Sequence, residues 1–173
     1  MAETEDWPTV ICDAGPLIHL DEIGCLDLLL DFQAILIPEQ VRDEVALHRP
    51  AALGTPDLEI EILPVTVSSD SQFRALVRAF SLDAGEQAAL SLMKLYPDAL
   101  FLTDDAAARL AAKASGFRSF GSLGVLLRSH RLGRRGKGEI LSILRELPSC
   151  STLHVRTSLL QEVIEQVEGM LES

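Results

Sequence analysis

Four carboxylates stand where short apolar runs of the sequence end or where a helix begins. Asp13 closes one apolar run, Asp104 and Asp105 close another, and Glu86 lies in the first turn of a predicted helix. An acid at the end of an apolar strand is costly to bury unless a partner stabilises its charge. Carboxylates that meet raise one another's pKa unless a cation lies between them.

Together these acids predict a divalent-cation site. Carboxylate oxygens, with no histidine or cysteine in a zinc-ligand spacing, favour Mg²⁺ or Mn²⁺ over zinc. Mg²⁺ takes one or two protein carboxylates and fills its other positions with water and substrate phosphate. The natural chemistry of such a site is metal-assisted hydrolysis of a phosphate ester.

Each acid also has a structural explanation. Aspartate at a helix N-cap accepts hydrogen bonds from unpaired backbone N–H groups, and Asp83-x-x-Glu86 has the spacing of a capping box. Capping and metal binding therefore both stay open for Glu86, Asp104 and Asp105. Asp13 is harder to explain by capping alone, because it closes an otherwise apolar strand.

Four further residues near the acids have two interpretations each. Thr103 can orient a carboxylate, or it can only stabilise a turn. Arg109 follows Asp105 by four residues, the spacing of an ordinary ion pair on a helix. Glu44 lies on a predicted helix and either enters the site or faces solvent. His19 lies in an apolar helix, and we expect it in the core or at an interface rather than in catalysis.

Strand-like and helix-like runs alternate along the chain, which places the acids. Strands are predicted at 9–13, 34–37, 58–63, 99–103 and 117–120, with helices between them and a terminal helix at 156–172. Strands separated by helices form a parallel sheet covered on both faces. The run 58–63 alternates apolar and polar residues, as expected at a sheet edge. Ligands of such folds bind beyond the carboxyl ends of the strands, where the acids stand.

Length and composition narrow the class of protein. The chain has 173 residues with 47% apolar and 24% charged residues, which fits one globular domain. No apolar run approaches the roughly 18 residues of a membrane span, and the acidic N-terminus, residues 1–6, lacks the layout of a signal peptide. We therefore expect a cytoplasmic protein with no membrane partner. The three cysteines match neither a disulfide framework nor a zinc site.

The charge is unevenly distributed. A net charge of −11 argues against a nucleic-acid partner, but residues 106–138 contain eight Lys or Arg residues and no acid. Such a basic stretch attracts polyanions whatever the overall charge. The alternative is a solvated helix face balanced by acids from elsewhere in the fold, and the sequence leaves both open.

Three motifs, in this order, resemble the PIN domain. They are Val10-Ile-Cys-Asp13-Ala-Gly-Pro-Leu-Ile-His-Leu20, Leu82-Asp-Ala-Gly-Glu86-Gln-Ala-Ala and Phe101-Leu-Thr-Asp104-Asp105-Ala-Ala-Ala-Arg109-Leu-Ala. Two further segments, Val41-Arg-Asp-Glu44-Val and Gly121-Ser-Leu-Gly-Val-Leu-Leu127, resemble its small stand-alone prokaryotic members related to VapC-type toxins. The resemblance covers roughly residues 8–147. The first motif alone is weak, but three at these separations are specific.

The resemblance implies a fold and a set of site residues. The fold is Rossmann-like, a three-layer α/β/α arrangement with a parallel sheet of about five strands, in a single domain 1–173 with its core at about 8–147. Asp13, Glu86 and Asp105 match the acids that hold Mg²⁺ or Mn²⁺, with Asp104 as an alternative or supporting ligand. The sequence departs from the family at a fourth acid, expected about a dozen residues after Asp105, where the polar residues besides the bases are Ser115, Ser119 and Ser122. This leaves the occupancy of a second metal open.

The resemblance also implies a function. We expect a metal-dependent endoribonuclease that prefers single strands, acts as the toxin of a toxin–antitoxin pair, binds an antitoxin protein and forms a homodimer. The residues expected to hold the RNA backbone are Arg118, Arg128, Arg131, Arg134, Arg135 and Lys137. The alternative is a catalytically weak PIN-like module that binds RNA or a protein partner. A phosphatase of similar fold is disfavoured, because Gly15 stands where its second aspartate would be.

Overall fold

A central parallel sheet organises the chain in the computed structural model, which describes residues 8–170. The strands are β1 (Thr9–Cys12), β2 (Ala34–Pro38), β3 (Ile60–Leu63), β4 (Leu100–Leu102) and β5 (Ser119–Phe120). They pair in parallel in the order β3-β2-β1-β4-β5. The chain thus runs outward from β1 in one direction through β2 and β3, and in the other through β4 and β5. The crevice at such a reversal is where parallel sheets bind ligands.

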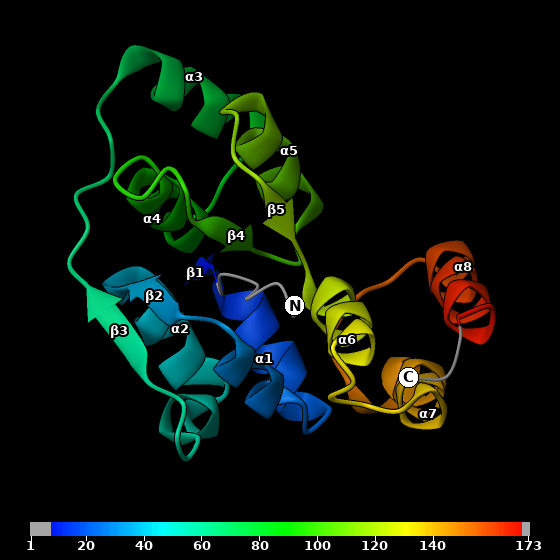
Figure 1. The fold of residues 1–173 in the computed structure, drawn as a ribbon. Coiled ribbons are helices and arrows are strands. Elements are labelled where there is room, and N and C mark those ends of the chain that lie inside the picture. Colours follow the sequence, from blue (N-terminus) through cyan, green and yellow to red (C-terminus); the bar gives the residue numbers. More distant parts are fainter. Residues whose placement is uncertain (1–7, 171–173) are drawn as a thin grey trace, which may run out of the picture.

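Helices cover both faces of the sheet (Figure 1). They are α1 (Ala14–Glu22), α2 (Glu39–His48), α3 (Ser71–Phe80), α4 (Ala84–Met93), α5 (Ala106–Ala114), α6 (Ser122–Arg131), α7 (Lys137–Cys150) and α8 (Thr157–Glu168), with 3₁₀ turns η1 (Leu26–Asp31) and η2 (Pro50–Gly54). Side chains alternate along β1, as the pleat requires. Val10 and Cys12 join the core beneath α1, α2 and α6, whereas Ile11 joins the core beneath α3, α4 and α5.

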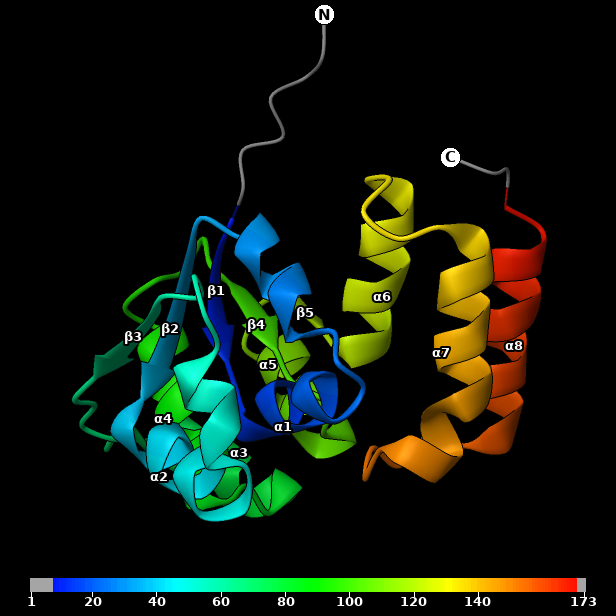
Figure 2. The same ribbon diagram turned by 90° about the horizontal axis from the view of Figure 1, so that it is seen from below.

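A helical hairpin extends the layer that contains α6. Figure 2 shows α7 and α8 side by side, on the side of α6 away from the sheet. Leu144 and Leu147 of α7 are buried in one cluster with Val163 and Val167 of α8. The extended segment 151–156, which we call the C-terminal strap, joins the two helices.

The predicted α/β fold with a parallel sheet is confirmed, and β3 lies at the predicted edge. The terminal helix differs from the prediction, because α8 begins at Thr157 and ends at Glu168 rather than spanning 156–172. Residues 171–172 of the predicted terminal helix and the acidic residues 1–6 lie outside the described part of the chain. Among residues 8–170, no helix has the length and apolar character needed to cross a membrane.

Candidate active site

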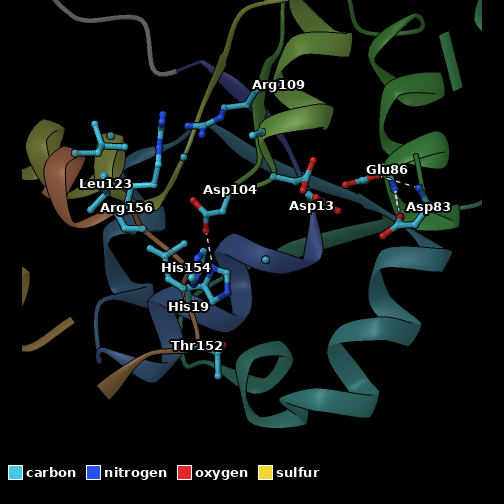
Figure 3. Close-up of a pocket in the computed structure, with 18 of the residues that line it drawn as sticks. Asp13, His19, Asp83, Glu86, Asp104, Arg109, Leu123, Thr152, His154 and Arg156 are labelled. Carbon is cyan, nitrogen blue, oxygen red and sulfur yellow. Dashed lines mark hydrogen bonds and ion pairs between the residues drawn. The ribbon is translucent and has the colours of Figure 1, made fainter. Parts of the chain in front are cut away.

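A cavity of about 610 Å³ opens at the carboxyl ends of β1 and β4 (Figure 3). Five helices begin at its wall, because the residues that precede α1, α4, α5, α6 and α8 all line it. Six acids line this pocket: Asp13, Glu44, Asp83, Glu86, Asp104 and Asp105. The structure therefore brings the four acids singled out in the sequence into one pocket. It also adds Asp83 and places Glu44 at the same wall.

Asp13 lies at the base of the pocket, directly after β1. The register that pairs Cys12 with Leu102 makes Asp13 the neighbour of Thr103 at the end of β4. Asp13 Oδ2 accepts a hydrogen bond of 2.9 Å from the Thr103 hydroxyl, and its Oδ1 accepts one of 2.9 Å from the backbone N–H of Ala14. Burial raises the pKa of Asp13 to about 7, and the nearby charges of Asp83 and Glu44 add to this shift.

Glu86 and Asp83 form the capping box expected at the start of α4. The Asp83 carboxylate accepts from the Glu86 N–H, and the Glu86 carboxylate accepts from the Asp83 N–H, both at 2.9 Å. Burial, together with the charges of Asp83, Asp105 and Asp13, raises the pKa of Glu86 to about 7. The capping interpretation of Glu86 is thus correct, and the same side chain also faces the other acids of the pocket.

Asp105 and Asp104 are adjacent in sequence but serve different parts of the site. Asp105 is exposed and caps α5, accepting a hydrogen bond of 2.8 Å from the Ala108 N–H. Asp104 accepts three hydrogen bonds: 2.7 Å from His19 Nδ1, 2.7 Å from the Ser122 N–H and 2.6 Å from the Ser122 hydroxyl. Asp104 therefore holds the start of α6 against α1.

The place of His19 differs from the sequence expectation. We expected a core or interface residue, whereas His19 lines the pocket and contacts Asp104. The two residues are 85 positions apart, so no local pattern signals their contact. The backbone of Gly121 also lies close to Asp104. A Cβ atom on Gly121 would be only 2.6 Å from Asp104 Oδ1.

The donor set suits a hard divalent cation, although the acids are not arranged as a compact cluster. Within residues 8–170, no three His, Cys, Asp or Glu side chains lie close enough together to hold an ion. Asp13, Glu86 and Asp105 nevertheless share the pocket, and their charges act on one another. Because Mg²⁺ needs only one or two protein carboxylates, these residues fit such an ion chemically. A shell in which all three are direct ligands remains a prediction.

The six basic residues expected to hold RNA lie outside this pocket. Arg118 precedes β5, and the others lie on α6 or after it. Several of the six interact within the chain. Arg134 pairs with Asp31 and Arg135 with Asp27, Lys137 donates to the backbone carbonyls of Glu168 and Met170, and Arg128 lies over the Phe32 ring. For Arg134 and Arg135, the balanced-face alternative describes the surroundings, and contact of the six residues with RNA remains a prediction.

Arg109 of α5 differs from its predicted role, and the residues that sequence reasoning missed come from the C-terminal strap. Arg109 lines the pocket, and no ion pair between it and Asp105 is present in the described structure. The strap contributes Thr152, Leu153, His154, Val155 and Arg156 to the wall. This segment has no helical or strand periodicity and no recognisable motif, so its position could not be deduced from the sequence.

Comparison with known proteins agrees with this architecture. No curated protein matches the chain significantly. A family model described as a PIN domain, DUF3368, matches residues 9–169. The match extends beyond residue 147 and includes α7, the strap and α8. The parallel sheet, the acids at its carboxyl edge and this match over nearly the whole sequence lead to one conclusion: the chain belongs to the PIN domain family.

Proposed function

We propose that this protein is an endoribonuclease that hydrolyses phosphodiester bonds of single-stranded RNA with the help of Mg²⁺ or Mn²⁺. Membership of the PIN family supports a nuclease-type fold. The observation that carries the proposal is the pair of buried acids, Asp13 and Glu86, each with a pKa raised to about 7 in one pocket. Perturbed carboxyl groups that converge in a cavity are typical of catalytic sites.

In this mechanism Asp13, Glu86 and Asp105 would hold the cation. When bound, the metal would polarise the phosphate and lower the pKa of a water molecule. The Thr103 hydroxyl fixes the orientation of Asp13, and the Asp83 N–H fixes one oxygen of Glu86. The pKa of Glu86, raised to about 7 in the metal-free pocket, would fall when a cation binds beside it, so the Glu86 carboxylate would be charged and available as a ligand.

The test is cleavage of a labelled single-stranded RNA by the purified protein, with and without Mn²⁺. We expect cleavage that stops with EDTA and falls at least about a hundredfold in Asp13→Asn, because the charge beside the metal is lost. Asp43→Asn is a matched control, since Asp43 is an exposed acid on α2 that pairs with Arg42 outside the pocket. Full activity of Asp13→Asn would falsify the assignment.

A second candidate, a PIN-like module that binds RNA or a protein without cutting, is favoured by one observation. No three metal-binding side chains of residues 8–170 lie within reach of one ion, and Asp13, Glu86 and Asp105 already accept helix-capping hydrogen bonds. Calorimetric titration with Mn²⁺ separates the two candidates. A nuclease binds the ion in wild type and loses this binding in Asp13→Asn, whereas a module that does not cut shows no Asp13-dependent heat.

The remaining parts of the proposal concern the biological setting. A toxin of a toxin–antitoxin pair would act in the cytoplasm, would be a homodimer, and would be inhibited by an antitoxin. The acids of the pocket offer a binding site for an arginine of such an antitoxin. To test this point, the protein is coexpressed with an antitoxin candidate and the complex is purified. The complex should no longer cleave RNA.

A further inference from the structure

The C-terminal strap forms a wall of the pocket that is fixed to the body of the protein. Both carboxylate oxygens of Glu22, at the end of α1, hold it. Oε2 accepts from the Ser151 hydroxyl and the Thr152 N–H at 2.7 Å each, and Oε1 accepts from the Thr152 hydroxyl at 2.8 Å. The next residues along the strap, from Thr152 to Arg156, line the cavity. This wall is therefore positioned by specific hydrogen bonds.

The pocket is divided by charge. Figure 3 shows Arg109 and Arg156 on one side of Asp104, and Asp13, Asp83 and Glu86 on the other. Arg109 comes from α5 and Arg156 from the strap, so two separate elements bring positive charge to the same wall. Both side chains belong to exposed residues.

These two arginines differ from several others in the protein. Arg134, Arg135 and Arg145 each form an ion pair with a carboxylate. Among residues 8–170, neither Arg109 nor Arg156 has a carboxylate within ion-pairing distance, although six acids line the same pocket. Two guanidinium groups without an ion-pair partner, beside a site for phosphate chemistry, are suited to bind a second phosphate.

Apolar side chains lie beside the arginines. Figure 3 shows Leu123 from α6 beside Arg156, and Leu159 from α8, which also lines the pocket, is 38% exposed. A flat apolar ring can pack on such leucines. The bases of single-stranded RNA have their faces free for this contact, whereas the bases of a duplex are stacked on one another.

We propose that this half of the pocket binds the nucleotide next to the scissile phosphate. Arg109 and Arg156 bind its phosphate, and Leu123 and Leu159 pack against its unstacked base, so the strap selects single-stranded over duplex RNA. The chemical class of the ligand rests on the proposed ribonuclease function. The site itself rests on the cavity, the two arginines and the fixed strap.

Binding can be tested separately from cleavage. Anisotropy of a labelled single-stranded oligoribonucleotide, titrated in EDTA, measures affinity without metal. Arg156→Gln and Arg109→Gln are each expected to lower affinity about tenfold and to reduce the slope of log affinity against log salt by about 0.7, the value for one phosphate contact on a single strand. Arg156→Lys keeps the charge and is expected to retain most of the affinity.

Controls separate this site from general effects of charge and folding. Arg145→Gln removes an exposed arginine of α7 that does not line the pocket, and its affinity should equal that of wild type. Leu159→Ser should reduce the preference for single-stranded over duplex RNA without removing charge. Urea unfolding midpoints should match wild type in Arg156→Gln, because the side chain is exposed and makes no cap hydrogen bond to α8.

Two outcomes distinguish failure of this inference from failure of the proposed function. If wild type cleaves RNA with Mn²⁺ but Arg156→Gln binds and cleaves as well as wild type, the subsite is overturned and the nuclease stands. If wild type never cleaves but Arg156→Gln loses RNA binding, the subsite stands and the nuclease fails. Loss of affinity in Arg134→Gln/Arg135→Gln, with none in Arg156→Gln, would place the RNA at the far end of α6 and also overturn the subsite.

Discussion

The Thr103 hydroxyl donates a hydrogen bond of 2.9 Å to Asp13 Oδ2, although the two residues are 90 positions apart in sequence. Thr103 is fully buried, and its hydroxyl also accepts a hydrogen bond of 3.2 Å from the backbone N–H of Asp105. One hydroxyl therefore connects two acids of the pocket across neighbouring strands. Its donated hydrogen bond lowers the pKa of Asp13 against the larger, opposite effect of burial.

Thr103→Val keeps the shape of this side chain and removes the hydroxyl. The pKa of Asp13 should rise further, because its charged form loses a donor. A cation needs the charged carboxylate, so the pH of half-maximal cleavage should move up by about one unit, the size expected for a hydrogen bond to a charged group. The pH profile of Mn²⁺-dependent cleavage measures this shift, and Thr103→Ser should restore it. An unchanged profile in the valine variant would remove Thr103 from the site.

Substitutions of Asp104 and Asp105 should have different effects, the first mainly on stability and the second mainly on RNA cleavage. Asp104→Ala removes the acceptor of three hydrogen bonds between α1 and α6, so it should lower the free energy of unfolding by about 3 kcal/mol. Asp105→Asn keeps a capping side chain on α5 and should cost less than about 1 kcal/mol, while losing most cleavage. Urea unfolding and cleavage assays give both quantities. Wild-type stability in Asp104→Ala, together with lost cleavage, would instead make Asp104 a direct ligand.

Gly121→Ala should destabilise the protein through a clash. Its Cβ would lie 2.6 Å from Asp104 Oδ1 and 3.2 Å from the backbone oxygen of Thr103, so one of these groups must move. We expect a loss of about 1–3 kcal/mol in the free energy of unfolding. Gly138→Ala is the matched control, because no atom lies within 4 Å of its added Cβ. It should stabilise the first turn of α7 by about 0.5 kcal/mol. Equal effects of the two changes would contradict the close packing at Gly121.

Stability should depend on pH and metal together. Asp13 and Glu86 have a pKa of about 7 in the folded chain but about 4 when unfolded. Between these values the folded state binds more protons, so the free energy of unfolding falls as pH rises. A cation favours the charged carboxylates, so Mg²⁺ should raise Tm more at about pH 8 than at about pH 5.

The size of this effect follows from binding. At a free ion concentration of 100 times Kd, binding adds about 2.7 kcal/mol to the free energy of unfolding. This corresponds to a Tm increase of about 5–10 °C for a domain of this size. Differential scanning fluorimetry with Mg²⁺ at both pH values measures it. In the double variant Asp13→Asn/Glu86→Gln, the increase in Tm with Mg²⁺ should vanish. The part of the pH dependence of stability that these two acids cause should vanish as well. A Tm independent of Mg²⁺ at about pH 8 would count against metal binding at these acids.

The sheet and the carboxyl-edge acids could be predicted because their signals are local. Short apolar runs predicted β1 and β4, and the spacing of Asp83 and Glu86 predicted their capping box. The carboxyl ends of parallel strands meet at one edge, so Asp13 and Asp105 had to lie near each other. These predictions need only periodicity, cap chemistry and the geometry of a parallel sheet.

The rest of the site depends on contacts between distant segments, which periodicity does not encode. His19 reaches Asp104 because α1 packs beside the start of α6, and Glu22 fixes a strap that is about 130 residues away. Asp31 and Asp27, which pair with Arg134 and Arg135, come from η1, far from the basic stretch in sequence, whereas Glu139, the second partner of Arg135, is only four residues away. An apolar helix containing one histidine does not reveal which way that histidine points.

Asp13, Asp83 and Asp105 each begin a helix as well as lining the pocket. A related protein that no longer cuts RNA would not need negative charge at these three positions. It would still need a side chain there that caps the first turn of α1, α4 and α5. Asparagine, serine and threonine meet the second need without the first. Inactive relatives should therefore carry these three residue types at the three positions, and rarely alanine or leucine.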